Sequence, residues 1–89
     1  MKAVITVTGK DTVGIIAEVS GVCAQHGANI LDITQSVIGE YFAMIMLTDI
    51  SKLSSDFSAF VDALEQLGAS KNLVIHAMHE DIFNTMHHI

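Results

Sequence analysis

The sequence predicts an α+β sandwich in which two helices cover one face of a four-stranded antiparallel sheet. Three observations predict it. The 89 residues repeat a strand–helix–strand pattern, both predicted helices are followed by a Gly-Ala pair, and an asparagine opens the strand after each helix. A strand–helix–strand unit that is duplicated in this way gives the ferredoxin-like order βαββαβ.

The first half of the chain reads as strand, helix, strand. Residues 3–8 (AVITVT) are rich in β-branched side chains, which favour a strand. Gly27 stands where a left-handed residue commonly ends a helix, and residues 29–38 (NILDITQSVI) alternate between apolar and polar side chains like a second strand. Between them, apolar side chains at helical spacing predict a stripe that faces the sheet: Ile15, Val19, Val22, Cys23 and His26.

The second half repeats this order. A hairpin turn at Gly39 and Glu40 leads into a third strand at 41–49 (YFAMIMLTD), and the serine-rich residues 51–55 supply N-caps for the next helix. Gly68 is expected to end that helix, and residues 72–79 (NLVIHAMH) form the fourth strand. The stripe of the second helix comprises Phe57, Phe60, Val61, Leu64 and Leu67.

A short tail follows this core of residues 1–80. Residues 81–89 (DIFNTMHHI) are expected to form a C-terminal helix with its apolar side chains on one side: Ile82, Phe83, Met86 and Ile89. The chain has no proline and no linker-like composition, so we predict a single domain over residues 1–89.

The third predicted strand is apolar on both faces. Tyr41, Ala43, Ile45 and Leu47 alternate there with Phe42, Met44 and Met46. The two helices cover only one face of the sheet, so something else must cover the other. A second copy of the chain is the simplest candidate, and we predict a homodimer.

Composition excludes several classes of partner. The chain is 51% hydrophobic with a formal net charge of −6, and its four basic residues are all lysines. It therefore lacks the basic patch that nucleic acid or an anionic membrane surface requires. No apolar run resembles a signal peptide or a membrane span, and we expect a cytoplasmic location. Cys23 is alone, which excludes an internal disulfide.

The loop after the first strand, in VTGKDTVGIIAEV (7–19), lacks the residues that catalysis would need. A phosphate-binding P-loop requires Lys and Ser or Thr where Ile15 and Ile16 stand. An acyl-phosphate hydrolase of this fold would need an arginine, and a copper carrier would need two cysteines in the loop. We therefore predict a protein that is not an enzyme and that carries no cofactor.

The same loop offers groups that suit an amino acid. Gly14 lets the backbone approach a ligand closely, and the free N–H groups at the start of the helix suit a carboxylate. Asp11 is an acceptor for an ammonium group, and Asn29 at the start of the second strand offers a donor and an acceptor.

The stretch GKDTVGIIAEVSGVCAQHGANILDITQSV resembles the ACT domain. In that family's pattern, an acidic or amide residue precedes a loop glycine by three positions, and G-x-N-I enters the second strand. Asp11 and Gly14 match the first part here, and Gly27 and Asn29 with Ile30 match the second. The V-x-G-K-D-x-x-G-I opening is similar to that of stand-alone ACT proteins related to the glycine cleavage system transcriptional repressor.

The resemblance implies a regulatory module that binds an amino acid or similar small metabolite at a dimer interface. Loop one of one subunit would face strand two of its partner. Asp11, Gly14 and Asn29 are then the predicted ligand-binding residues, with Thr12, Val13, Ile15 and Ile30 as their neighbours. We expect no attached catalytic or DNA-binding domain, so the output would pass through an unknown protein partner.

Three alternatives remain open. A site shared across a dimer could bring His26 or His76 together with an acid from the partner, as an enzyme would require. Gly9 and Gly14 can simply shape the turn while Asp11 or Thr12 caps the helix. The chain can also be a dimerisation or protein-interaction module that binds no small ligand.

The histidines and the cysteine invite chemical roles that their spacing does not support. His79-Glu80 fails the H-E-x-x-H template because Phe83 stands at the second histidine position. His76 and His79 should point to opposite faces of a strand. We predict no metal site, and we interpret Cys23 as a buried core residue.

Overall fold

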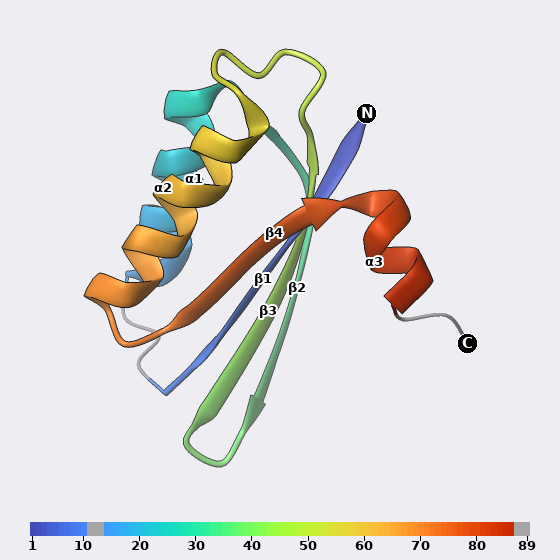
Figure 1. Cartoon of the computed structure of the whole chain (residues 1–89). Helices are drawn as coiled ribbons and strands as arrows, with labels where there is room; N and C mark the ends of the chain where they lie inside the picture. The colour runs from blue at the N-terminus through green and yellow to red at the C-terminus, as the bar shows by residue number, and fades with distance from the viewer. Residues whose placement is uncertain (11–13, 87–89) are drawn as a thin grey trace.

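The computed structural model describes residues 1–10 and 14–86 (Figure 1). Its elements follow the predicted order, including the C-terminal helix: β1 (Lys2–Gly9), α1 (Ile15–His26), β2 (Asn29–Ile38), β3 (Tyr41–Asp49), α2 (Phe57–Ser70), β4 (Val74–His79) and α3 (Glu80–Met86). The predicted ferredoxin-like fold is therefore confirmed. Ile89 of the predicted tail helix lies outside the described residues.

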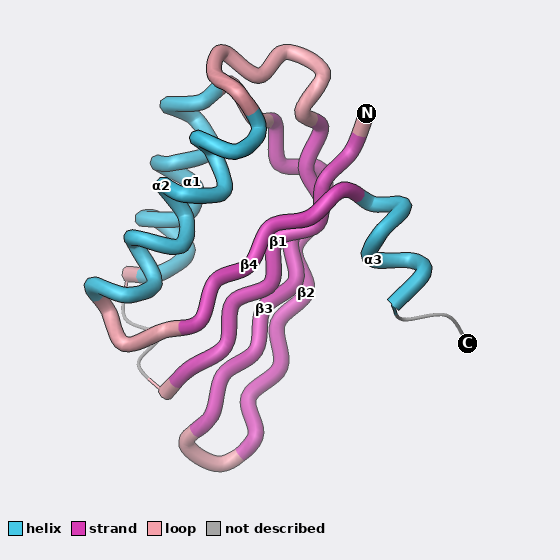
Figure 2. The backbone as a smooth tube through the Cα atoms, in the orientation of Figure 1, coloured by secondary structure: helices cyan, strands magenta, loops and turns pink. Residues whose placement is uncertain are grey.

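The four strands form an antiparallel sheet in the order β2-β3-β1-β4. Helices α1 and α2 lie together on one face, whereas α3 lies on the opposite side of the sheet (Figures 1 and 2). The β2–β3 ladder has one irregularity, a register shift between Ile30 and Asp32, which the alternating sequence pattern did not indicate.

The core lies between the helices and the sheet. Phe60 and Leu64 of α2 are fully buried there, together with Val19 of α1 and Met46 of β3. Burying an apolar side chain of this size contributes about 1.5–3 kcal/mol to the free energy of unfolding. Both predicted helical stripes are thus confirmed as the faces that pack on the sheet.

The boundary between α2 and β4 differs from the prediction. Gly68 does not end the helix, which continues to Ser70. Gly68 is buried, and a Cβ atom there would lie 2.8 Å from the Leu73 carbonyl oxygen and 3.0 Å from Ile75 Cγ1 of β4, so the glycine lets α2 approach the sheet. Asn72 has a φ of 57°, a left-handed conformation that interrupts the extended chain, and β4 begins only at Val74.

The third strand has the two apolar faces that the sequence predicts. Phe42, Met44 and Met46 are buried beneath the helices. On the other face, Tyr41 and Ile45 are 57% and 42% exposed.

None of the helices within residues 1–10 and 14–86 is long and apolar enough to span a membrane.

Candidate functional site

Gly14 lies at the start of α1 in a left-handed conformation, with a φ of 74°. The Glu18 N–H donates to the Gly14 carbonyl at 3.0 Å, which closes the first turn of the helix. Ile15 is 2% exposed and belongs to the core, so only its backbone is available to a ligand. Asp11, Thr12 and Val13 lie outside the described residues, so their predicted ligand or capping roles stay predictions.

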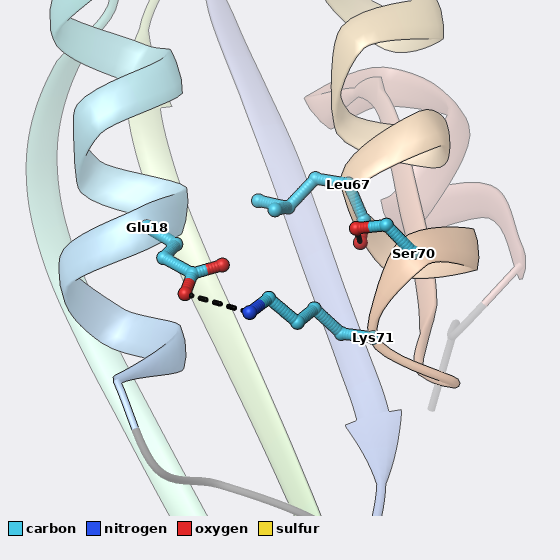
Figure 3. Close-up of polar contacts among 4 residues, drawn as sticks. All are labelled: Glu18, Leu67, Ser70 and Lys71. Carbon is cyan, nitrogen blue, oxygen red and sulfur yellow. Dashed lines mark hydrogen bonds and ion pairs between the residues drawn. The ribbon is translucent and has the colours of Figure 1, made fainter.

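An ion pair ties this end of α1 to the neighbouring helix. The Lys71 ammonium lies 3.2 Å from Glu18 Oε1, directly after the end of α2 (Figure 3). The Ser70 hydroxyl donates to the Leu67 carbonyl at 2.8 Å in the last turn of α2 (Figure 3). The first turn of α1 is therefore held beside the end of α2.

Asn29 lies at the opposite end of α1. It is the exposed first residue of β2 and faces Asp49 across the β2–β3 ladder. The half-buried Ile30 follows and packs against the core. The 12 residues of α1 rise by about 18 Å, at 1.5 Å for each residue. Within one chain, Gly14 and Asn29 therefore do not contribute to a common pocket.

A cavity of about 230 Å³ adjoins Asn29, and its lining carries charges of both signs. The lining residues are Gly27, Asn29, Asp49, Ser51 and Lys52. The Ser51 N–H donates to Asp49 Oδ1 at 2.9 Å, and this bond is the main cause that lowers the pKa of the Asp49 carboxyl below its ordinary value. The carboxylate is therefore charged at neutral pH.

A larger cavity of about 640 Å³ lies between the start of β1 and α3. Its lining includes Lys2, His79, Glu80 and Asp81. The His79 ring stacks on Phe57 of α2 with 4.2 Å between the ring centroids, and its Nδ1 is buried without a partner among the described residues. The cavity thus lies beside the junction of β4 and α3.

Cys23 is a core residue, as predicted. It is 1% exposed on α1, and burial raises the pKa of its thiol to about 11. A thiol with this pKa is protonated at neutral pH and is not a nucleophile. Across residues 1–10 and 14–86, no three His, Cys, Asp or Glu side chains gather closely enough to hold a metal ion.

Most of the chain matches a known family of domains. A family model of the ACT domain matches residues 2–78. The chain belongs to the ACT domain family. ACT domains are regulatory modules that commonly dimerise and bind amino acids or related small metabolites.

Relatives of this ACT domain protein include stand-alone proteins of the same size. It is 55% identical to the UPF0237 protein of Methanococcus maripaludis over 97% of this chain and 96% of that one. An ACT domain protein from Streptococcus pneumoniae superposes with a TM-score of 0.80 at 43% identity, covering 93% of each chain. A protein described as a glycine cleavage system transcriptional repressor has a TM-score of 0.71 at 31% identity, with 86% of this chain and 44% of that one covered.

The cavity beside Asn29 adds three residues that the sequence analysis of this ACT domain missed. Asp49, Ser51 and Lys52 lie at the end of β3 and directly after it. The predicted antiparallel pairing of the second and third strands was the available signal, because it brings the end of the third strand beside the start of the second.

Proposed function

We propose that this ACT domain is a non-enzymatic regulatory protein that binds an amino acid or a related small metabolite at the interface of a homodimer. The separation of Gly14 from Asn29 by the length of α1 carries the proposal. Two groups that suit one zwitterion lie too far apart to meet in one chain. They can meet when each comes from a different chain.

The outer edge of β2 supports a contact between two copies. β2 is an edge strand of ten residues with one charged side chain, Asp32. The backbone groups that face away from β3 pair with no other strand within residues 1–10 and 14–86. Long edge strands without lysine or proline tend to pair with another strand. The opposite edge strand, β4, has only six residues.

Antiparallel pairing of two β2 strands would bring the separated groups together. Ile38 pairs with Tyr41 and Gly9 with Phe42, so β2 ends on the side of the sheet where β1 ends and the loop to Gly14 begins. In an antiparallel pair, the start of one β2 lies beside the end of the other. The partner's Asn29 would then face the loop before Gly14.

The chemistry at such a junction suits an amino acid. The first N–H groups of α1 have no partner within the helix, and the positive end of the helix dipole favours a carboxylate. In our proposal, Asp11 accepts the ammonium group, the backbone of Thr12 to Ile15 surrounds the carboxylate, and the partner's Asn29 closes the site. Ligand occupancy would alter the dimer and be read by a protein partner.

Calorimetry against the twenty amino acids, with light scattering on the same samples, tests this function. We expect heat from at least one amino acid, one bound molecule for each subunit, and a mass of two chains. No heat from any amino acid, together with an unchanged melting temperature, would reject ligand binding.

A further inference from the structure

We infer that the cavity beside Asn29 is a recognition site for the charged groups of an α-amino acid, with Asp49 binding the ammonium group and Lys52 the carboxylate. The inference rests on the proposed function and deepens it. It assigns charge recognition to residues at the start of β2 and the end of β3, in addition to the loop after β1.

The Asp49 carboxylate has a fixed orientation beside Asn29, in which it can bind a cation. It lies directly opposite Asn29 in the β2–β3 ladder, where opposite Cβ atoms are about 5 Å apart. The Ser51 N–H occupies one carboxylate oxygen at 2.9 Å and fixes the orientation of the group. The charges of the N-terminus and Lys2 also favour the ionised carboxylate, and an ammonium group would use the acceptor positions that Ser51 leaves.

Lys52 is available for an anion. Lys10 lies 3.3 Å from Glu40 and Lys71 lies 3.2 Å from Glu18, so two of the other lysines are already paired. Over residues 1–10 and 14–86, neither the Lys52 ammonium nor the Asn29 amide has a hydrogen bond or ion pair. Among the described residues, Asp49 and Lys52 form no ion pair with each other, so Lys52 remains available to a ligand. Lys2 lies opposite Asp49 in the β1–β3 ladder, and its charge already acts on that carboxylate.

The end of α1 packs against the residues after β3 and so positions one wall of the cavity. A Cβ atom on Gly27 would lie 2.6 Å from the Lys52 carbonyl oxygen, so the end of α1 is in close contact with the backbone of Lys52. The Ser54 N–H also donates to the His26 carbonyl at 2.8 Å. The C-terminal end of a helix favours a cation, which supports an ammonium group on this side of the cavity.

The lining selects the class of ligand. One carboxylate is too few for a metal ion, which needs several oxygen ligands. One lysine without an arginine is a poor phosphate site. Charges of both signs beside an amide and a hydroxyl favour a small molecule that itself carries both signs, as an α-amino acid does. At about 230 Å³, the cavity admits a small polar molecule.

Chemical shifts of backbone amides test the inference with three probes: glycine, methylamine and acetate at millimolar concentration. Glycine carries both charges, and the other two carry one each. We expect glycine to shift the amides of Gly27, Asn29, Ser51 and Lys52. Asp49→Asn should weaken glycine and methylamine binding at least tenfold and spare acetate. Lys52→Gln should weaken glycine and acetate binding equally and spare methylamine.

Two further variants control for charge and folding. Asp62→Asn removes an exposed carboxylate on α2 and should leave all three responses unchanged. Lys52→Arg keeps the positive charge and should retain glycine binding. A glycine response that survives both Asp49→Asn and Lys52→Gln, or no glycine response at this cavity, would overturn the inference.

The same spectra separate this inference from the proposed function. Amino-acid shifts at Gly14–Glu18 and Asn29 in a dimer, with none at Ser51 and Lys52, would keep the interface site and reject the cavity. Glycine shifts at the cavity in a chain that stays monomeric would keep the cavity and reject the interface site.

Discussion

Glu18 and Lys71 form an ion pair of 3.2 Å that joins the first turn of α1 to the residue after α2. Both side chains are partly exposed, so the pair contributes less than about 1 kcal/mol to the free energy of unfolding. Its position matters more, because Glu18 lies one turn after Gly14, where we propose that a carboxylate binds.

Lys71→Gln should weaken amino-acid binding severalfold and leave stability nearly unchanged. The substitution frees the Glu18 carboxylate, which then repels the carboxylate of the ligand. Calorimetry and urea unfolding measure the two effects. Glu18→Gln in addition should restore the affinity. Equal binding by Lys71→Gln and the natural chain would show that no carboxylate binds near this turn.

Two helical glycines should respond oppositely to alanine. Gly68→Ala places a Cβ 2.8 Å from the Leu73 carbonyl oxygen, and the resulting overpacking should lower the free energy of unfolding by about 1–3 kcal/mol. A Cβ atom at the exposed Gly21 of α1 would meet nothing within 4 Å, so Gly21→Ala should raise the free energy of unfolding by about 0.5–1 kcal/mol through helix propensity. Urea unfolding measures both. A stabilising Gly68→Ala would contradict the close approach of α2 to the sheet.

Cys23 should make stability fall as the pH rises above 9. Burial raises the pKa of its thiol from 9.0 to about 11, so the unfolded chain loses this proton at a lower pH than the folded chain. Between pH 9 and 11 the unfolded state binds fewer protons, and the free energy of unfolding therefore decreases. Unfolding at pH 8 and pH 10.5, with Cys23→Ala as the control, measures this contribution. If the natural chain and Cys23→Ala lose the same free energy of unfolding between pH 8 and pH 10.5, groups other than Cys23 cause the loss.

Thr34→Lys should abolish the proposed dimer and leave a monomer. Thr34 is exposed near the middle of β2, so in an antiparallel β2 pair two lysines would lie close together and repel each other. Light scattering gives the mass, and circular dichroism checks the fold.

Thr8→Lys is the matched control for Thr34→Lys. Thr8 is an exposed threonine of the central strand β1, away from the β2 edge, and its substitution should leave a dimer. A monomer from Thr8→Lys and a dimer from Thr34→Lys would move the interface from the β2 edge to the open face of the sheet.

The sequence predicted those features that depend on periodicity. Phe60 and Leu64 lie on a clear helical stripe, and both are buried against the sheet. The position of Gly68 inside α2 was not predictable, because a sequence does not distinguish a glycine that ends a helix from one that lets a neighbouring backbone approach. The register shift between Ile30 and Asp32 depends on pairing with β3, which local alternation does not encode.

The candidate site was predictable only in part. Motif spacing selected Gly14 and Asn29, but it could not show that α1 separates them. Asp49 and Lys52 belong to no motif and become candidates only when β3 lies beside β2.

Subunit complementation tests the shared site most directly. Asp11→Ala and Asn29→Ala should each abolish amino-acid binding in a homodimer. In a mixed dimer, the intact loop of the Asn29→Ala chain faces the intact Asn29 of the Asp11→Ala chain. Calorimetry on unfolded and refolded mixtures should then recover one binding site for each mixed dimer. Mixtures that remain as inactive as the two separate variants, although mass spectrometry shows mixed dimers, would contradict a ligand site built from two chains.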